Sequence, residues 1–146
     1  MTRTPEQTVN LMLARLLAKD MDGVADLWAL EGVAEFPFAA AGSPPVVHGR
    51  EAIRQYLANY PELLDVREVP AKTVHHTTDP DTVVVEFTAQ GLTVRTGQPY
   101  ELSYIAVVTT ADGEITRYRD YWSPVAVAAA LGELPALLTA LAEESA

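Results

Sequence analysis

The sequence predicts an α+β fold in which helices come first and an antiparallel sheet follows. Apolar residues recur at helical spacing up to Pro61, and from Val66 onward their period changes to two. The second half also contains Asp112-Gly113, the strongest short signal for a β-hairpin. Because the helices precede the meander and do not alternate with its strands, the pattern indicates α+β and not α/β.

Three helices are expected before the meander. The first begins after Thr4, which can act as N-cap, with Pro5 at the first helical position. Asp20 begins a short second helix whose buried stripe runs to Trp28. Gly49 leads into a third helix, which Pro61 is expected to end.

Strands are expected between the second and third helices and then throughout the second half. After the last strand, Ser123-Pro124 is a cap followed by proline, so it predicts a C-terminal helix through Leu131 that Gly132 ends. Regularly spaced leucines from Leu134 onward suggest one more helical segment. The predicted strands cover 32–38, 67–76, 82–91, 99–110 and 114–122.

The composition is that of a globular protein and excludes several functional classes. The 146 residues fit one domain spanning 1–146, and 49% of them are hydrophobic. A formal net charge of −10 argues against nucleic acid and anionic membranes as partners. There is no cysteine, the N-terminal stretch lacks the apolar core of a signal peptide, and no apolar run is long enough to cross a membrane. The expected location is the cytoplasm.

The predicted turn at Asp112-Gly113 sets the pairing of the last two strands. A two-residue turn there places Val107 opposite Tyr118 and Ile105 opposite Asp120. Asp120 then shares one face of the sheet with aromatic and aliphatic side chains. If that face is the inner one, desolvation raises the pKa of the carboxyl, as a general acid requires.

The same alternation sends Arg117, Arg119 and Tyr121 to the opposite face. That face also carries apolar residues, among them Tyr104. Sheets that are apolar on both sides commonly bury one face against helices and the other against a second subunit. We therefore expect a homodimer.

Three segments together resemble the SnoaL-like branch of the NTF2-like superfamily, which has the ketosteroid isomerase-like fold. They are EFPF at 35–38, HGREAI at 48–53 and DYWSP at 120–124, and the resemblance covers roughly residues 6–130. It implies a cone, in which a curved antiparallel sheet wraps around three N-terminal helices, with an additional C-terminal helix. It further implies a mostly apolar pocket and a homodimer. The scaffold hosts many chemistries, so the fold alone does not assign a reaction.

Comparison with two enzyme groups of this superfamily leaves Asp120 as the only matched catalytic acid. In the ketosteroid isomerases, the general base, the phenol donor and the second acid correspond to Phe36, Met12 and Ile105. In limonene-type epoxide hydrolases one acid matches Asp120, but its arginine and second acid fall on apolar positions. Neither mechanism is expected here.

Two other groups match better. In the phenazine-biosynthesis A/B proteins, a histidine before a turn resembles His76 and an acid on the last strand matches Asp120. SnoaL-type polyketide cyclases likewise use an inward aspartate, which again points to Asp120. His76 and His75 alternate in direction, so either can be the inward one, and a capping or surface role for His76 is the competing interpretation.

The predicted pocket holds a hydrophobic small molecule and no cofactor. The three histidines lack metal-ligand spacing, and no glycine-rich phosphate loop follows a strand. Aromatic residues are the candidate contacts, although a purely core role is the competing interpretation. The candidate ligand-binding residues are Trp28, Phe36, Tyr56, Phe87, Ile105, Tyr118 and Trp122.

These observations favour a cofactor-independent acid–base enzyme of bacterial secondary metabolism, an isomerase, cyclase or dehydratase acting on an apolar or polyketide-like substrate. Asp120 is the predicted acid, with His76 as its candidate partner. The alternative is a non-catalytic protein that binds small molecules on the same fold. A third hypothesis, a purely structural dimerising module, would require a core without a pocket.

Overall fold

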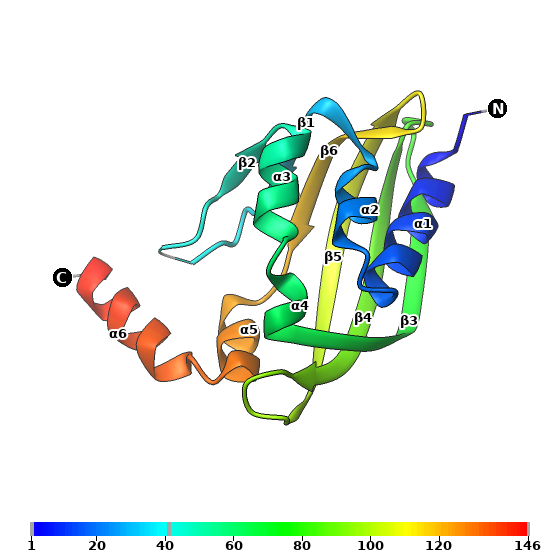
Figure 1. Cartoon of the computed structure of the whole chain (residues 1–146). Helices are drawn as coiled ribbons and strands as arrows, with labels where there is room; N and C mark the ends of the chain where they lie inside the picture. The colour runs from blue at the N-terminus through cyan, green and yellow to red at the C-terminus, as the bar shows by residue number, and fades with distance from the viewer. Residues whose placement is uncertain (1, 41, 146) are drawn as a thin grey trace.

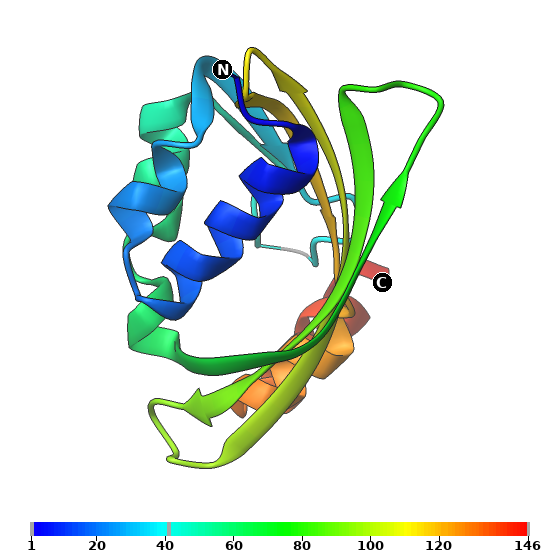
Figure 2. The ribbon, with the colours of Figure 1, turned by 90° about the vertical axis from the view of Figure 1, so that its right-hand side faces the viewer.

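The computed structural model describes residues 2–40 and 42–145 and shows a curved sheet with helices against its concave face (Figures 1 and 2). The elements are α1 (Pro5–Leu17), α2 (Met21–Ala25), β1 (Trp28–Glu35), β2 (Val46–His48), α3 (Arg50–Leu57), α4 (Tyr60–Leu63), β3 (Leu64–His76), β4 (Thr82–Thr93), β5 (Pro99–Ala111), β6 (Glu114–Tyr121), α5 (Pro124–Leu131) and α6 (Leu134–Ser145).

The predicted α+β class is confirmed, but the sheet is mixed and not purely antiparallel. Its strand order is β2-β1-β6-β5-β4-β3, and β1 runs parallel to β6 while the other neighbours are antiparallel. In Figure 2 the sheet bends around α1, α2 and α3, so these helices cover its concave face. This arrangement creates the space in which the candidate site lies.

The start of each of the first two helices follows the predicted capping chemistry. Thr4 and Gln7 form a capping box at α1, with the Gln7 amide donating to Thr4 Oγ1 at 3.1 Å. The Asp20 carboxylate accepts from the Gly23 amide at 2.9 Å at the start of α2. The third helix is shorter than predicted and ends at Leu57, and α4 follows with Pro61 in its first turn, where proline is tolerated.

The first strand lies earlier in the chain than predicted. The sequence pattern assigned Trp28 to the second helix and a strand to 32–38, whereas β1 is Trp28–Glu35 and α2 ends at Ala25. The cause is a partner far away in sequence: the Ile115 amide donates to Leu27 O at 2.8 Å, and Trp28 pairs with Ile115 in the parallel ladder. The short strand β2 was not predicted, and it pairs with the end of β1.

The hairpin turn is confirmed, but the predicted register beyond it is wrong. Thr110 pairs with Ile115 and Thr109 with Arg117, so Thr116 is an extra residue in β6. This bulge shifts the pairing by one position, and Asp120 lies opposite Ala106 instead of Ile105.

The shift changes which β5 residues share a face with Asp120. Tyr118 pairs with Val108, which is fully buried, so Val108 and Ala106 point toward the helices. Ile105 is 44% exposed and points outward. The predicted placement of Ile105 and Val107 beside the acid is therefore wrong, while the inward direction of Tyr118 and Asp120 is confirmed.

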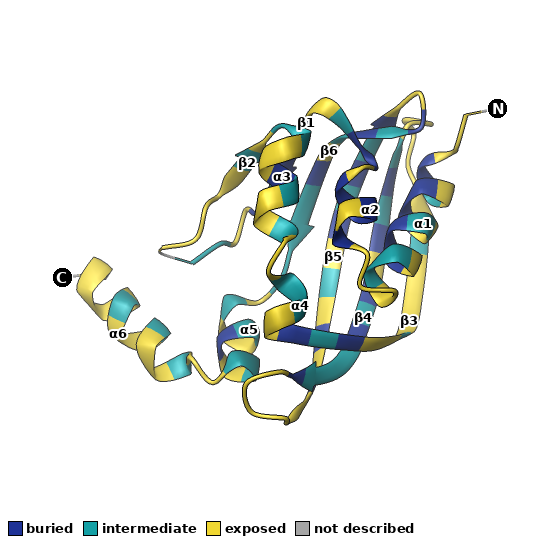
Figure 3. Ribbon diagram, in the orientation of Figure 1, coloured by how far each residue is buried: buried dark blue, intermediate teal, exposed yellow. Residues whose placement is uncertain are grey.

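The buried side chains gather between the helices and the inner face of the sheet, as the dark stripes in Figure 3 show. The inner face of β4 alternates in the expected way, with Val83, Val85 and Phe87 buried. The predicted C-terminal helix is confirmed as α5, with Ser123 as its cap and Gly132 in the left-handed conformation at its end. Beyond it, α6 extends away from the sheet and has no buried residue (Figures 1 and 3).

Candidate functional site

A cavity of about 360 Å³ lies between the helices and the concave face of the sheet. Apolar side chains from α1, α2 and α3 line it on one side, and β4, β5 and β6 line it on the other. Val127 and Leu131 of α5 close one part of the wall. Six of the predicted ligand contacts line this cavity: Trp28, Phe36, Tyr56, Phe87, Tyr118 and Trp122.

Asp120 is the only carboxyl among the described residues that line this cavity. Its Oδ1 is inaccessible to solvent and has no hydrogen-bond partner in the described part of the chain. Burial raises the pKa of Asp120 from its ordinary value to about 7. A large part of the Asp120 population is therefore protonated near neutral pH.

Aromatic rings surround this acid and pack against one another. The ring of Phe36 lies 4.9 Å from that of Tyr56 and 5.1 Å from that of Trp122, measured between centroids. Trp28 and Tyr118 are 5.5 Å apart in the same way. Contacts of this kind hold the rings in fixed orientations, so the acid faces a shaped apolar wall.

Two tyrosines that sequence reasoning did not select also line the cavity, Tyr60 and Tyr104. The sequence pattern places Tyr60 in the third helix, and the predicted register, which the bulge in β6 makes wrong, places Tyr104 on the outer face. Burial raises the pKa of both phenols, so both stay protonated at neutral pH. Tyr104, Ala106 and Val108 occupy every second position of β5 and therefore share one face of the sheet. This period-two spacing is the sequence signal that identifies Tyr104 as an inward residue.

His76 does not lie in the cavity. Its Nε2 is 3.0 Å from Glu6 Oε1 on the surface, and its side chain is 72% exposed. The neighbouring His75 is also exposed, with its Nε2 2.6 Å from Glu86 Oε2. Strand β3 thus directs both rings to solvent, and the predicted pairing of a histidine with Asp120 is not found.

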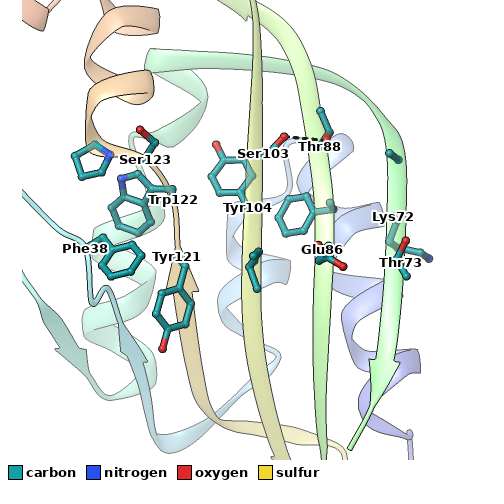
Figure 4. Close-up of a pocket in the computed structure, with 14 residues that line it drawn as sticks. Phe38, Lys72, Thr73, Glu86, Thr88, Ser103, Tyr104, Tyr121, Trp122 and Ser123 are labelled. Carbon is teal, nitrogen blue, oxygen red and sulfur yellow. Dashed lines mark hydrogen bonds between the residues drawn. The ribbon is translucent and has the colours of Figure 1, made fainter.

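Ile105 lies in a second depression, an open groove of about 580 Å³ on the outer face of the sheet. Figure 4 shows Phe38, Tyr121 and Trp122 together at one side of this groove, with Thr88 and Ser103 on the neighbouring strands. The Phe38 and Tyr121 rings are 5.3 Å apart. We call this depression, lined by Phe38, Ile105, Tyr121 and the residues around them, the outer groove.

The arginines beside Asp120 belong to the outer face as well. Arg117 Nε and Glu35 Oε1 are 2.9 Å apart, and the second guanidinium nitrogen donates to Glu35 Oε2 at 3.0 Å. This bidentate pair joins β6 to β1 outside the cavity. The expectation that Arg117 points away from Asp120 is confirmed.

Two further observations concern metals and membranes. Within residues 2–40 and 42–145, no three histidine, aspartate or glutamate side chains come close enough to hold a metal ion. None of the helices in this part of the chain has both the length and the apolar character needed to cross a membrane.

Comparison with known proteins identifies the family. The model of the SnoaL-like domain matches residues 9–118. The chain belongs to the SnoaL-like family. The resemblance to the SnoaL-like and NTF2-like proteins is confirmed, and the α+β cone with it.

Several individual proteins are similar to this SnoaL-like chain. An uncharacterized Bacillus subtilis protein, YesE, is 42% identical over 126 residues, 86% of each chain. A PhzA/B-like Pseudomonas aeruginosa protein, PA3332, is 38% identical over 117 residues, 80% of this chain and 82% of its own length. A crystal structure named "Putative Isomerase from Bacillus subtilis" is 41% identical with a TM-score of 0.85, covering 88% of this chain and 93% of that one. TerC, co-crystallised with polyporic acid, shares the fold at 21% identity and a TM-score of 0.73, over 88% and 98% of the two chains.

The raised pKa of Asp120 makes stability depend on pH in a defined direction. Between pH 4 and pH 7 the unfolded chain ionises this carboxyl while the folded chain keeps it protonated, so rising pH favours unfolding. Asp120→Asn removes this effect. Between pH 5.5 and pH 8.5 the stability of the variant relative to the wild type should rise by about 2 kcal/mol, and urea denaturation at several pH values measures it. A stability difference that does not change with pH would contradict the raised pKa.

Proposed function

We propose that this protein is a cofactor-independent acid–base enzyme, of the isomerase, cyclase or dehydratase type, acting on an apolar or polyketide-like small molecule. Asp120 donates or shuttles the proton. The observation that carries the proposal is the Asp120 Oδ1, which is buried at a cavity wall without a hydrogen-bond partner in the described residues. A buried polar atom of this kind is costly unless a ligand uses it.

The environment of Asp120 suits proton transfer. A general acid or base works best when its pKa is close to the operating pH, and burial brings the pKa of this carboxyl to about 7. Without a neighbouring charge to fix its state, the same group can give a proton to an oxygen or carbon and take one back later in the reaction. The apolar wall excludes water, which keeps the carboxyl protonated near neutral pH and strengthens its electrostatic interaction with a bound ligand.

The relatives support this class of function. The matching family is the SnoaL-like domain, and a structure that is 41% identical is named "Putative Isomerase". Another structure that shares the fold is named a "putative polyketide cyclase". TerC, which shares the fold, was co-crystallised with polyporic acid, a small molecule. The cavity of this chain, with its aromatic walls and few polar groups, is likewise of the kind that binds small molecules. We also propose that the protein works in the cytoplasm within secondary metabolism.

Proton exchange at carbon tests the proposal without knowledge of the natural substrate. The protein is incubated in D₂O with a panel of apolar ketones and polyketide-like phenolic ketones, and deuterium uptake is measured by mass spectrometry. Exchange should depend on the protein, with a rate that changes with pH around 7. Asp120→Asn should reduce that rate by about 100-fold or more.

The matched control is Asp81→Asn, which makes the same chemical change in an exposed turn. It should leave the exchange rate unchanged. Equal rates in the wild type and Asp120→Asn would show that another group transfers the proton and would overturn the assignment.

A second candidate function is non-catalytic binding of a small molecule. It is favoured by the absence of a second acid or a histidine beside Asp120 among the described residues of the cavity. Native mass spectrometry separates the two functions. A co-purifying ligand that is released unaltered, and that Asp120→Asn binds as tightly as the wild type, would support binding over catalysis.

We further propose that the protein is a homodimer that buries the outer groove against a second copy. Ile105 is 44% exposed and Phe38 is 59% exposed, and both lie in this groove. A sheet that buries one face against helices and exposes apolar residues on the other is commonly covered by a partner. The groove and the cavity share Trp122 in their walls, so assembly would also support the site.

Ile105→Asp tests this interface, because it places a charge at the centre of the proposed contact. Light scattering with size-exclusion chromatography should show a dimer for the wild type and a monomer for this variant. The control Val94→Asp changes a half-exposed apolar residue after β4 and should remain dimeric. A monomeric wild type would contradict the proposal.

A further inference from the structure

The cavity has two chemically different ends. The part of the wall formed by α1 and α2 is apolar, with residues such as Met12, Leu16 and Val24. Asp120 and the phenol groups of the wall come from α3, α4, β5 and β6. A ligand that fills the cavity therefore meets hydrocarbon at one end and hydroxyl groups at the other.

The fold brings Tyr104 and Tyr60 to the end where Asp120 lies. Asp120 pairs with Ala106 across the β5–β6 ladder, and Tyr104 is the next residue of β5 on the same face. Tyr60, at the start of α4, faces the same space and packs with Tyr104 against the buried residues of β3, β4 and β5. Burial raises the pKa of both phenols, so both stay protonated, and a hydrogen bond joins their two hydroxyls.

We propose that Tyr60 and Tyr104 form an oxygen-recognition pair, which selects ligands with a carbonyl or phenol oxygen on a flat apolar ring system. The two hydroxyls are hydrogen-bonded to each other, so the pair has one remaining hydroxyl proton. The pair donates this proton to the ligand oxygen and so sets the ring edge beside Asp120. This rests on the proposed function only in placing the ligand in this cavity.

The stacking of Tyr104 explains how its hydroxyl is held in place. Its ring lies 5.0 Å from that of Phe87, with an angle of 19° between the planes. Figure 4 shows the Tyr104 ring alongside β5, on the side of the strand toward Trp122. A stacked ring keeps its position when the hydroxyl is removed, so Tyr104→Phe changes the hydrogen bond and leaves the wall intact.

A cationic ligand is the main competing occupant. Ionised Asp120 among aromatic rings is a suitable environment for a tertiary amine. The neutral phenol pair favours the oxygen ligand, because its free hydroxyl proton can be donated to the lone pairs of that oxygen. Titration with an aromatic amine separates the two ligand classes.

Three probes are compared. The ketone is 1-tetralone, which has a bicyclic ring system, and the hydrocarbon is naphthalene, which has two fused rings without the oxygen. The amine is N,N-dimethylbenzylamine. Equilibrium dialysis at one pH measures the dissociation constants. The wild type should bind the ketone more tightly than the hydrocarbon or the amine. Tyr104→Phe should weaken ketone binding by about tenfold, the value of one hydrogen bond, and leave naphthalene binding unchanged.

The controls separate this proposal from that for Asp120. Tyr100→Phe removes a buried phenol that lies outside the cavity and should change the affinity for neither 1-tetralone nor naphthalene. Asp120→Asn should retain the preference for the ketone, even where it has lost proton exchange. The double variant Tyr60→Phe/Tyr104→Phe should bind ketone and hydrocarbon alike.

Three outcomes would overturn the oxygen-recognition pair. The first is equal affinity of the double variant and the wild type for 1-tetralone. The second is a wild type that prefers the amine or the hydrocarbon, and the third is a wild type that binds none of the three probes. None of them would change the exchange test of Asp120, so the two proposals fail separately.

Discussion

The candidate site of this protein depends on one constraint: a carboxyl group is held at the wall of an apolar cavity without a hydrogen-bond partner among the described residues. Asp120 Oδ1 has neither solvent contact nor a hydrogen bond within the described residues, and burial brings its pKa to about 7. Burying this carboxyl without a hydrogen-bond partner costs free energy of folding. The packing of the surrounding rings of Phe36, Trp122 and Tyr118 contributes free energy that offsets it. A group kept in this state is available to a ligand.

The β-bulge at Thr116 determines which residues accompany the acid. With the extra residue in β6, Ala106 and Tyr104 of β5 turn toward Asp120, and Ile105 turns to the outer groove. Two surfaces thus arise from one pair of strands. The inner surface combines an acid with phenols, and the outer surface exposes apolar side chains next to the ion pair of Arg117 and Glu35.

The sequence predicted what depends on neighbours in the chain and failed where distant partners decide. The capping of α1 by Thr4, the turn at Asp112-Gly113 and the inward direction of Asp120 all follow from local patterns, and the structure has all three. The start of β1 at Trp28 depends on pairing with Ile115, which no local pattern shows. For the same reason the bulge in β6 and the position of Tyr104 were not predicted.

The direct test of the account is the ionisation of Asp120 itself. Infrared difference spectra between the wild type and Asp120→Asn, recorded across the pH range, isolate the carboxylic-acid band of this residue. The account predicts that the band disappears with a midpoint near pH 7. A midpoint near pH 4, the ordinary value for aspartate, would contradict the buried, unpartnered acid on which the proposed function rests.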